Sequence, residues 1–163
     1  MRATRITHVS IYANSLEESA SFYEELFGMD RLPTANFPGG GVLWLRLGEV
    51  QLHLFESAGD RPTERHHFGM DVDDFDAVYE KAKAMGILDT RAFGTSLRTH
   101  PAGWAQLYLR DPAGNLIEVD WPDVSTLAAS TLADAVPLES TVPQEGEAAI
   151  ATLYHEPARA AVT

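Results

Sequence analysis

The amino-acid sequence predicts an α+β fold in which two βαβββ modules form one curved mixed sheet, shaped like a cup, followed by a C-terminal tail. Three observations predict it: a strand-then-helix pattern that occurs twice, short strand-like runs after each helix, and a change of composition near Pro122. The modules cover about residues 4–57 and 64–121, within a domain of residues 1–121. Residues 122–163 form an extension that we expect to be partly helical or irregular.

The first module begins with a strand over residues 7–12, where polar and apolar residues alternate. Ser15 is placed to cap a helix, and Glu18 follows it at capping-box spacing. Apolar residues at helical spacing continue to Phe27, and Gly28 favours the end of the helix. Three short strand-like runs come next, at residues 31–36, 42–47 and 49–56.

The second module repeats this order. An alternating strand over residues 67–72 leads into a helix that Asp73 or Asp74 caps and that Gly86 ends. Three further strand-like runs follow, at residues 88–93, 103–110 and 115–121. The sequence Asp-Pro-Ala-Gly-Asn at residues 111–115 is typical of a turn, and it joins the last two runs into a hairpin.

The tail has less regular patterning than the modules. Apolar residues follow Asp123 at helical spacing, namely Val124, Leu127, Ala128 and Leu132. We therefore expect the tail to begin with a short amphipathic helix. Pro137 and Pro143 predict an irregular stretch, and residues 147–155 another helical turn or two. Docking on a partner subunit, covering of the domain, and loose ordering all remain open for this tail.

Composition excludes several classes of function. The 163 residues include 24 acids and 12 bases, which give a net charge of −12, so nucleic acid and anionic membranes would repel the chain. The absence of cysteine excludes disulfide scaffolds, iron–sulfur clusters and thiol nucleophiles. No apolar run has the length of a membrane span, and the N-terminus lacks the apolar block of a signal peptide, so we expect a cytoplasmic protein.

Strand alternation predicts which side chains face the inside of the cup. His8 and His67 begin the first strand of their modules, while His53 and Glu118 lie in the last strand of theirs. These positions are roughly equivalent in the repeat, so pseudo-twofold symmetry is expected to bring the four side chains together. Two imidazoles and one carboxylate with open positions suit Fe(II), Mn(II), Zn(II) or Ni(II), and the residues do not choose among these ions.

A more specific pattern lies in the second half of the chain. It runs from His100 through Tyr108 and the turn at residues 111–115 to Glu118. With His8, His53 and His67 it resembles the vicinal oxygen chelate superfamily, which includes glyoxalase I, fosfomycin- and bleomycin-resistance proteins and extradiol dioxygenases. The resemblance covers about residues 4–121 and is greatest to the single-domain type I extradiol ring-cleaving dioxygenases. Arg98 departs from this pattern, because these enzymes usually have a small or β-branched residue there.

The resemblance implies a role for each residue. His8, His67 and Glu118 match the triad that holds Fe(II). His53 falls near a histidine that lies beside the oxygen site and transfers protons, although it could instead be a fourth metal ligand. His100 and Tyr108 match residues that hydrogen-bond the substrate hydroxyls and assist their deprotonation.

The function expected from this resemblance is Fe(II)-dependent extradiol cleavage of a catechol-like aromatic with O2. The partners expected are the aromatic diol and a second copy of the chain, with no nucleic acid and no membrane. A glyoxalase-like lyase or isomerase that acts through an enediolate is the first alternative. A resistance protein that binds a small molecule without metal is the second alternative, and retention of the metal-binding residue types argues against it.

Overall fold

Two βαβββ modules, each with its own mixed sheet, make up the fold in the computed structural model, which describes residues 5–35, 41–57, 59 and 62–154. The first sheet has the strand order β1-β4-β3-β2. Its strands are β1 (His8–Ala13), β2 (Arg31–Leu32), β3 (Val42–Leu47) and β4 (Val50–Glu56). The second sheet has the order β5-β8-β7-β6-β9. Its strands are β5 (His67–Asp71), β6 (Leu97–Thr99), β7 (Ala105–Arg110), β8 (Leu116–Trp121) and β9 (Val136–Pro137).

The predicted fold class is confirmed, but the expectation of one continuous sheet is wrong. Within each module the first strand pairs in parallel with the last, and the neighbouring pairs are antiparallel. Strands β1 and β5 are the edge strands at which the modules face each other, and no backbone ladder joins them in the described part of the chain. Within the described part of the chain, the outer side of each of these edge strands therefore has no strand partner.

The two long helices begin and end as the sequence predicts. Helix α1 (Leu16–Phe27) is capped by Ser15, whose hydroxyl accepts a 3.3 Å hydrogen bond from the Glu18 backbone N–H. Helix α2 (Phe75–Met85) is capped by the Asp74 carboxylate, which accepts from Ala77 N at 2.9 Å. Both helices end at a left-handed glycine. Among the described residues, no helix combines the length and the apolar character that crossing a membrane requires.

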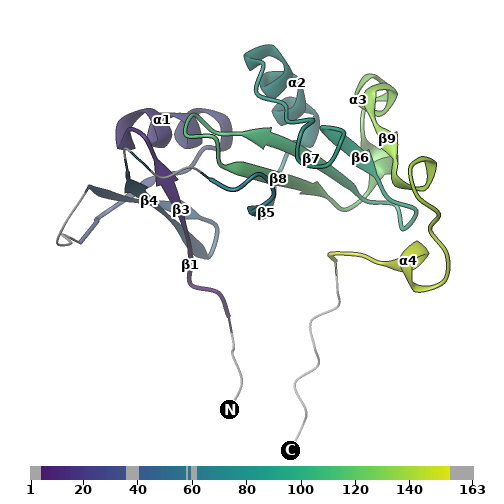
Figure 1. The fold of residues 1–163 in the computed structure, drawn as a ribbon, viewed down its shortest axis with the longest axis horizontal. Coiled ribbons are helices and arrows are strands. Elements are labelled where there is room, and N and C mark those ends of the chain that lie inside the picture. The colour runs from purple at the N-terminus through teal and green to yellow at the C-terminus, as the bar shows by residue number, and fades with distance from the viewer. Residues whose placement is uncertain (1–4, 36–40, 58, 60–61, 155–163) are drawn as a thin grey trace, which may run out of the picture.

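Helices α1 and α2 lie on the same side of the two sheets (Figure 1), and the core lies between these helices and one face of each sheet. The strand side chains that point toward the helices are the apolar residues that strand alternation predicts. They include Leu52, Leu54, Ile117 and Val119, none of which has any exposed surface. The residues between them therefore face away from the helices. Burial of this apolar set holds the polar set in place on the opposite face.

Residues 88–93 do not form the predicted strand. Only Leu88 makes an isolated bridge, to Leu109, and the strand of this region is β6 further along. The Asp89 side chain explains the difference, because it accepts a hydrogen bond from the Ala92 backbone N–H at 2.9 Å and so turns the chain. Asp89 also accepts from Arg110 Nε at 3.0 Å. This turn places the next residue, Phe93, against Tyr108.

The Asp89 turn gives a testable dependence of stability on pH. Burial of Asp89 raises its pKa, but hydrogen bonds from Ala92 and Arg110 outweigh burial, so the pKa lies below its usual value. A carboxylate whose pKa is lower in the folded state than in the unfolded state adds to the free energy of unfolding at neutral pH. This contribution is lost as pH falls through the folded-state pKa. Asp89→Asn should therefore lower the free energy of unfolding by about 2 kcal/mol at pH 7. Urea unfolding at several pH values should show that difference shrinking below about pH 4. A difference that does not change with pH would contradict this explanation.

A buried network of polar groups joins the two modules. The Asp111 carboxylate accepts hydrogen bonds from Tyr23 Oη at 2.9 Å and from Asn115 N and Nδ2, each at 2.7 Å. Asn115 Nδ2 also donates to the Tyr12 carbonyl at 2.7 Å. The turn between β7 and β8 is thus tied both to α1 and to the end of β1, which fixes the modules relative to each other.

The tail begins with two short helical segments in place of the single predicted helix. A 3₁₀ turn (Val124–Thr126) is followed by α3 (Ala129–Asp134). The helix breaks at Leu127 and Ala128, which are extended, and the Asp76 carboxylate accepts from Ala128 N at 3.0 Å in place of a helical acceptor. A second 3₁₀ turn (Leu138–Ser140) and α4 (Glu147–Ile150) follow. His155, the last residue of the predicted helical turns at 147–155, lies outside the described residues.

Candidate metal and ligand site

The registers of the two sheets confirm that the predicted residues occupy equivalent positions in the repeat. His53 on β4 lies opposite Ser10 on β1, two residues after His8. Glu118 on β8 lies opposite Gly69 on β5, two residues after His67. The next strand of each sheet adds an aromatic residue, because Trp44 pairs with His53 and Tyr108 pairs with Glu118. We call His8, His53 and Trp44 the first half-site, and His67, Glu118 and Tyr108 the second half-site.

The His67 side chain has the orientation of a metal ligand. Its Nδ1 lies 2.7 Å from the Arg65 carbonyl oxygen, which can only accept, so Nδ1 carries the proton. In the neutral imidazole, Nε2 then presents a lone pair to Glu118 Oε2 at 3.3 Å. Two lone pairs at this distance repel unless a proton or a cation lies between them. Two ligand atoms that bond one metal ion at about 2.1 Å and at right angles lie about 3 Å apart, which matches this pair.

Two buried carboxyl groups, those of Glu118 and Asp120, lie next to each other. Glu118 and Asp120 are only 6% and 5% exposed, and among the described residues neither pairs with lysine or arginine. Burial, then the charge and hydrogen bond of Glu118 and the charge of Asp71, raises the pKa of Asp120 to about 8, so without a bound cation Asp120 holds a proton at pH 7. Within the described chain, Oδ1 of Asp120 has no hydrogen-bond partner. A Cβ added at Gly69 would lie 2.9 Å from Asp120 Oδ2, so a larger residue there would push this carboxyl group aside. The donor set fits a cation, and a bound cation would favour loss of the Asp120 proton.

Aromatic side chains surround the His67 and Glu118 pair. The Tyr108 ring stands edge-on to the His67 ring, with the two ring centroids 6.2 Å apart. The Phe93 ring also stands edge-on to the His67 ring, with the centroids 5.7 Å apart. Burial, and then the charge and hydrogen bond of Glu118, raise the pKa of Tyr108. The Tyr108 hydroxyl therefore stays protonated and can donate a hydrogen bond next to the pair. Arg98 donates to the Phe93 carbonyl at 2.8 Å, so it supports the loop that carries this ring.

His100 directly follows β6 and lies near the start of β7, the strand that carries Tyr108. Its Nε2 is 2.7 Å from Gln106 Oε1, and its ring stacks on Trp104 with centroids 3.6 Å apart. Burial is the main cause that lowers the pKa of His100, so the ring is neutral at pH 7. Gln106 is two residues before Tyr108 on β7 and faces the same side. His100 thus lies on the side of the second half-site that leads toward the tail.

The first half-site brings two imidazoles into direct contact. The His8 and His53 rings stack with centroids 4.4 Å apart, and Trp44 stacks on the other face of His53 at 4.6 Å. Gln51 Oε1 contacts His53 Nε2 at 2.9 Å. Burial and then the neighbouring His8 lower the pKa of His53. His53 is therefore neutral at pH 7, which is the form that binds a metal or accepts a proton.

The two half-sites do not merge within one chain. Across residues 5–35, 41–57, 59 and 62–154, no three His, Asp or Glu side chains gather closely enough to hold a metal ion. The structure thus places the predicted residues in two pairs, His8 with His53 and His67 with Glu118. The assignment of His8, His67 and Glu118 to one metal ion stays a prediction.

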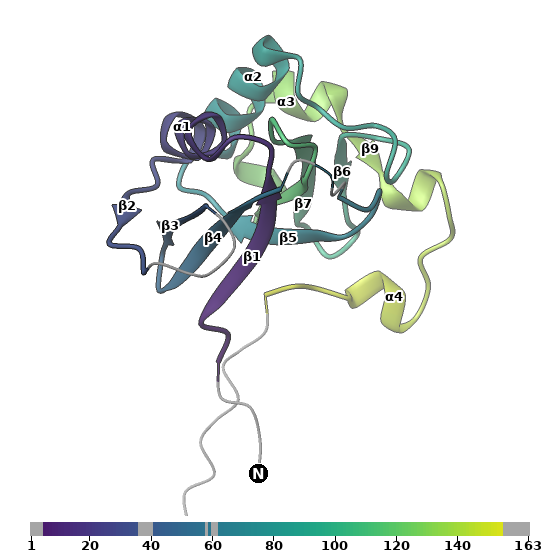
Figure 2. The same cartoon turned by 60° about the vertical axis from the view of Figure 1, so that its left-hand side comes forward.

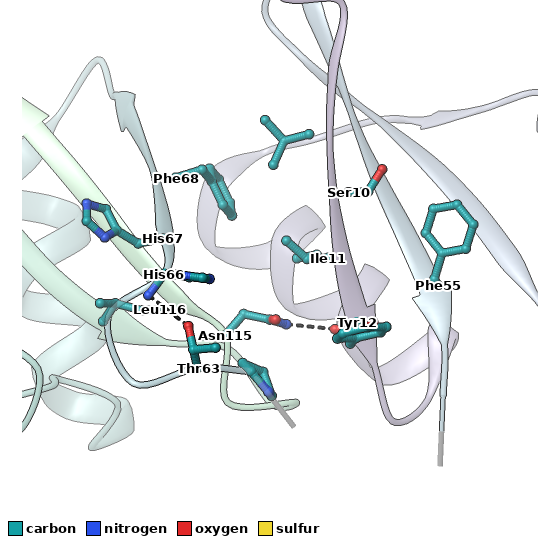
Figure 3. Close-up of a pocket in the computed structure, with 12 residues that line it drawn as sticks. Ser10, Ile11, Tyr12, Phe55, Thr63, His66, His67, Phe68, Asn115 and Leu116 are labelled. Atoms are coloured by element: carbon teal, nitrogen blue, oxygen red, sulfur yellow. Dashed lines mark hydrogen bonds between the residues drawn. The ribbon is translucent and has the colours of Figure 1, made fainter. Parts of the chain in front are cut away.

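A cleft of about 520 Å³ separates the modules between β1 and β5. Most of its walls are apolar, with Val9, Ile11 and Phe55 on one side and Phe68 and Leu116 on the other. Figure 3 shows Ser10 and His67 on its opposite sides, and the bond from Asn115 to Tyr12 crosses it. The cleft follows the two edge strands, so its walls are the surfaces that the modules leave uncovered.

Several residues of the site have no role in the sequence prediction. Alternation places Asp120 on the face of Glu118, but its crowding against Asp71 depends on the register of β5 and β8. Phe93 falls in the predicted strand at residues 88–93, so its place beside Tyr108 could not be predicted. The contact of Tyr154 with Asp71, at 2.7 Å, joins residues from the tail and the domain, and the sequence carries no signal for it.

Residues 5–119 match the family model described as Glyoxalase/Bleomycin resistance protein/Dioxygenase superfamily. The chain is also similar to the uncharacterized protein YwbC of Bacillus subtilis (strain 168). The two are 32% identical over 128 residues, which is 71% of this chain and 96% of YwbC.

Two solved structures share the fold. A lactoylglutathione lyase from Agrobacterium tumefaciens is 24% identical, with a TM-score of 0.55 over 74% of this chain and 95% of the lyase. The oxidase ChaP-H2 is 21% identical, with a TM-score of 0.57 over 76% of this chain and 99% of the oxidase. At these identities the likeness supports the fold and no particular reaction. A lyase and an oxidase share this fold, so the fold does not decide between the two activities.

Proposed function

Because the chain belongs to the Glyoxalase/Bleomycin resistance protein/Dioxygenase superfamily, we propose that it is a metal-dependent oxidoreductase that cleaves the ring of a catechol-like aromatic with O2. The metal ligands proposed are His8, His67 and Glu118, and the metal is Fe(II). The observation that supports this most is the His67 Nε2 atom held 3.3 Å from Glu118 Oε2, with the Tyr108 hydroxyl beside Glu118.

The donor set is a good match to a divalent metal ion that must keep positions open for ligands. Glu118 would neutralise one positive charge, while the Arg65 carbonyl would orient His67 through Nδ1. Bound at these residues, Fe(II) would supply Lewis acidity toward a diol and redox chemistry with O2. Mn(II), Zn(II) and Ni(II) suit the same donors.

We propose that the site is completed by a second copy of the chain. Each copy has one half-site in each module, and the described residues of one copy bring together only two ligands at a time. In a twofold dimer, the first half-site of one copy can face the second half-site of the other, which gives two equivalent sites. The exposed His8, the open edges of β1 and β5 and the apolar cleft between them supply surface for such contact.

The remaining side chains have proton-transfer roles in this proposal. Tyr108 donates a hydrogen bond toward the position of a substrate oxygen next to Glu118, which favours loss of that oxygen's proton. His53 is neutral and lies against His8, so it can accept a proton at the metal and later return it. His100 is neutral and held by Gln106, where it can hydrogen-bond a second hydroxyl.

One observation favours a second candidate function. Because the His53 and His8 rings are in contact, His53 can serve as a fourth metal ligand, as a glutamate does near this position in glyoxalase I. A lyase or isomerase that stabilises an enediolate would need such a ligand and no O2. Oxygen consumption therefore separates the two functions. A metal-free binding protein would show neither oxygen consumption nor bound metal.

The experiment that tests the proposed function is oxygen uptake by protein reconstituted anaerobically with Fe(II) and given a panel of catechols. We expect uptake that matches formation of a coloured ring-cleavage product. Tight metal binding with no uptake on any catechol would favour the lyase. Neither uptake nor bound metal would favour the metal-free binding protein.

Tyr108→Phe tests the proton-transfer role. The substitution keeps the ring that packs on Phe93 and removes only the hydroxyl next to Glu118. We expect kcat for catechol-dependent oxygen uptake to fall about a hundredfold while the bound iron per chain is unchanged. Tyr12→Phe, at a half-exposed tyrosine of the cleft rim, controls for loss of a hydroxyl as such. An unchanged kcat in Tyr108→Phe would remove Tyr108 from the chemistry.

A further inference from the structure

The second module is covered on a face that the helices do not reach. Strands β7 and β8 are buried along almost their whole length, on both faces, whereas β1 and β5 alternate between exposed and covered residues. Helices α1, α2 and α3 all lie on the same side of the sheets (Figure 1). Burial of Glu118, Asp120 and Tyr108 on the opposite side therefore requires another segment.

The C-terminal tail supplies part of this cover by passing from one face of the second sheet to the other. Helix α3 is held on the α2 side, where Asp134 accepts from Tyr79 Oη at 2.6 Å. Strand β9 then pairs with β6 and forms the edge of the second sheet, and the chain continues around that edge. Figures 1 and 2 show α4 on the side of the sheets opposite to α3. We call residues 147–154, which include α4, the strap.

Two hydrogen bonds hold the strap against this face. The Trp104 indole Nε1 donates to the Ala151 carbonyl at 2.9 Å, and the Tyr154 hydroxyl donates to Asp71 Oδ1 at 2.7 Å. Asp71 is the register partner of Asp120 on one side of β8. Trp104 immediately precedes β7 on the other side. Residues 151–154 therefore cross the sheet at the C-terminal end of β8.

This crossing leaves one end of the face open and closes the other. The Glu118 side chain is 7% exposed, but the His67 side chain, further from the crossing, is 28% exposed. Tyr154 lies at the closed end, where burial, Asp71 and then Asp120 and Glu118 all raise its pKa. Its hydroxyl therefore remains a donor to Asp71, next to the buried acidic residues.

We propose that Tyr154 is a specificity-determining residue, which forms the end wall of the ligand cup and excludes ring diols with a bulky substituent. The ligand cup is here the face of the second sheet at the second half-site, on the side opposite to the helices. This inference rests on the proposed function in taking a ring diol as the ligand of the cup. The wall belongs to the tail and not to either βαβββ module. Its position is set by the Asp71 and Trp104 bonds, so removal of the Tyr154 ring would lengthen the cup toward the C-terminal end of β8.

The test compares Tyr154→Ala with Leu153→Ala in the full-length protein reconstituted with Fe(II). Leu153 is the adjacent strap residue, and at 50% exposure it points to solvent. Catechol and 3-phenylcatechol are the probes, with dissociation constants measured anaerobically and kcat/KM measured by oxygen uptake. We expect Tyr154→Ala to shift selectivity toward 3-phenylcatechol about tenfold in both quantities, and Leu153→Ala to leave it unchanged.

The outcomes separate this inference from the proposed function. Oxygen uptake with unchanged selectivity in Tyr154→Ala would overturn the role of Tyr154 and keep the dioxygenase. Shifted binding selectivity without oxygen uptake in any protein would support the wall and overturn the dioxygenase. Equal shifts in Leu153→Ala and Tyr154→Ala would also overturn the inference, since general loosening of the strap would then explain both. If the wild-type protein bound neither probe, the wall would have no ring diol to exclude and the inference would fall.

Discussion

Glu118→Gln is expected to abolish retention of the metal and to lower catechol-dependent oxygen uptake by about a thousandfold. An amide oxygen carries no charge to offset that of the cation, and His67 Nε2 alone would remain on its side of the site. The substitution also removes one of two crowded buried carboxylates, since Glu118 contributes to the raised pKa of Asp120. The metal-free variant should therefore be at least as stable as the metal-free wild type at neutral pH.

This combination separates a metal ligand from a structural residue. Metal content by elemental analysis, oxygen uptake, and urea unfolding of the metal-free proteins would be measured side by side. Glu80→Gln, at an exposed carboxylate of α2, is the matched control and should change none of them. A Glu118→Gln protein that keeps its metal and activity would remove Glu118 from the site. Loss of activity together with marked loss of stability would instead indicate a structural role.

Asp111→Ala is expected to cause the largest loss of stability, about 3–4 kcal/mol in the free energy of unfolding. The carboxylate is 4% exposed and accepts three hydrogen bonds, so alanine would leave the Tyr23 hydroxyl and two N–H groups of Asn115 without their acceptor. Unpaired buried donors cost more than the net value of the bonds that they made.

Urea unfolding at pH 7 would measure this loss. Tyr23→Phe removes one of the three bonds without leaving a donor unpaired, so it should cost about 1–2 kcal/mol. Asp73→Ala, at an exposed carboxylate, is the control and should change stability by less than about 0.5 kcal/mol. If Asp111→Ala were no less stable than Asp73→Ala, the network would not join the modules as described.

Much of the fold follows from periodicity and capping residues in the sequence. Ser15, Asp74, Gly28 and Gly86 delimit the two long helices because each satisfies backbone groups that a helix end leaves free. Alternation also places His8, His67 and Glu118 on the polar faces of their strands, because a period of two needs no knowledge of tertiary structure. The pairs His8–His53 and His67–Glu118 follow once the repeat is recognised.

What could not be predicted depends on contacts between distant residues. The Asp89 side chain turns residues 89–92, so a run with strand-like composition became the loop that carries Phe93. Asp76 interrupts the predicted tail helix from another element, 52 residues away in sequence. Tyr154 reaches Asp71 only because the tail rounds the edge of the second sheet at β9. Strand periodicity likewise does not reveal that the two half-sites stay apart in one chain.

Subunit complementation tests most directly that one metal site is built from two copies. His8→Ala and His67→Ala proteins, each inactive alone, would be unfolded together in equal amounts, refolded and reconstituted with Fe(II). If each site combines His8 of one copy with His67 of the other, half of the dimers are mixed and each has one intact site. Oxygen uptake should then return to about a quarter of the wild-type value. No recovery, in a mixture shown to contain mixed dimers, would contradict a metal site shared between two copies. Sites built within single chains would all lack a ligand and would stay inactive.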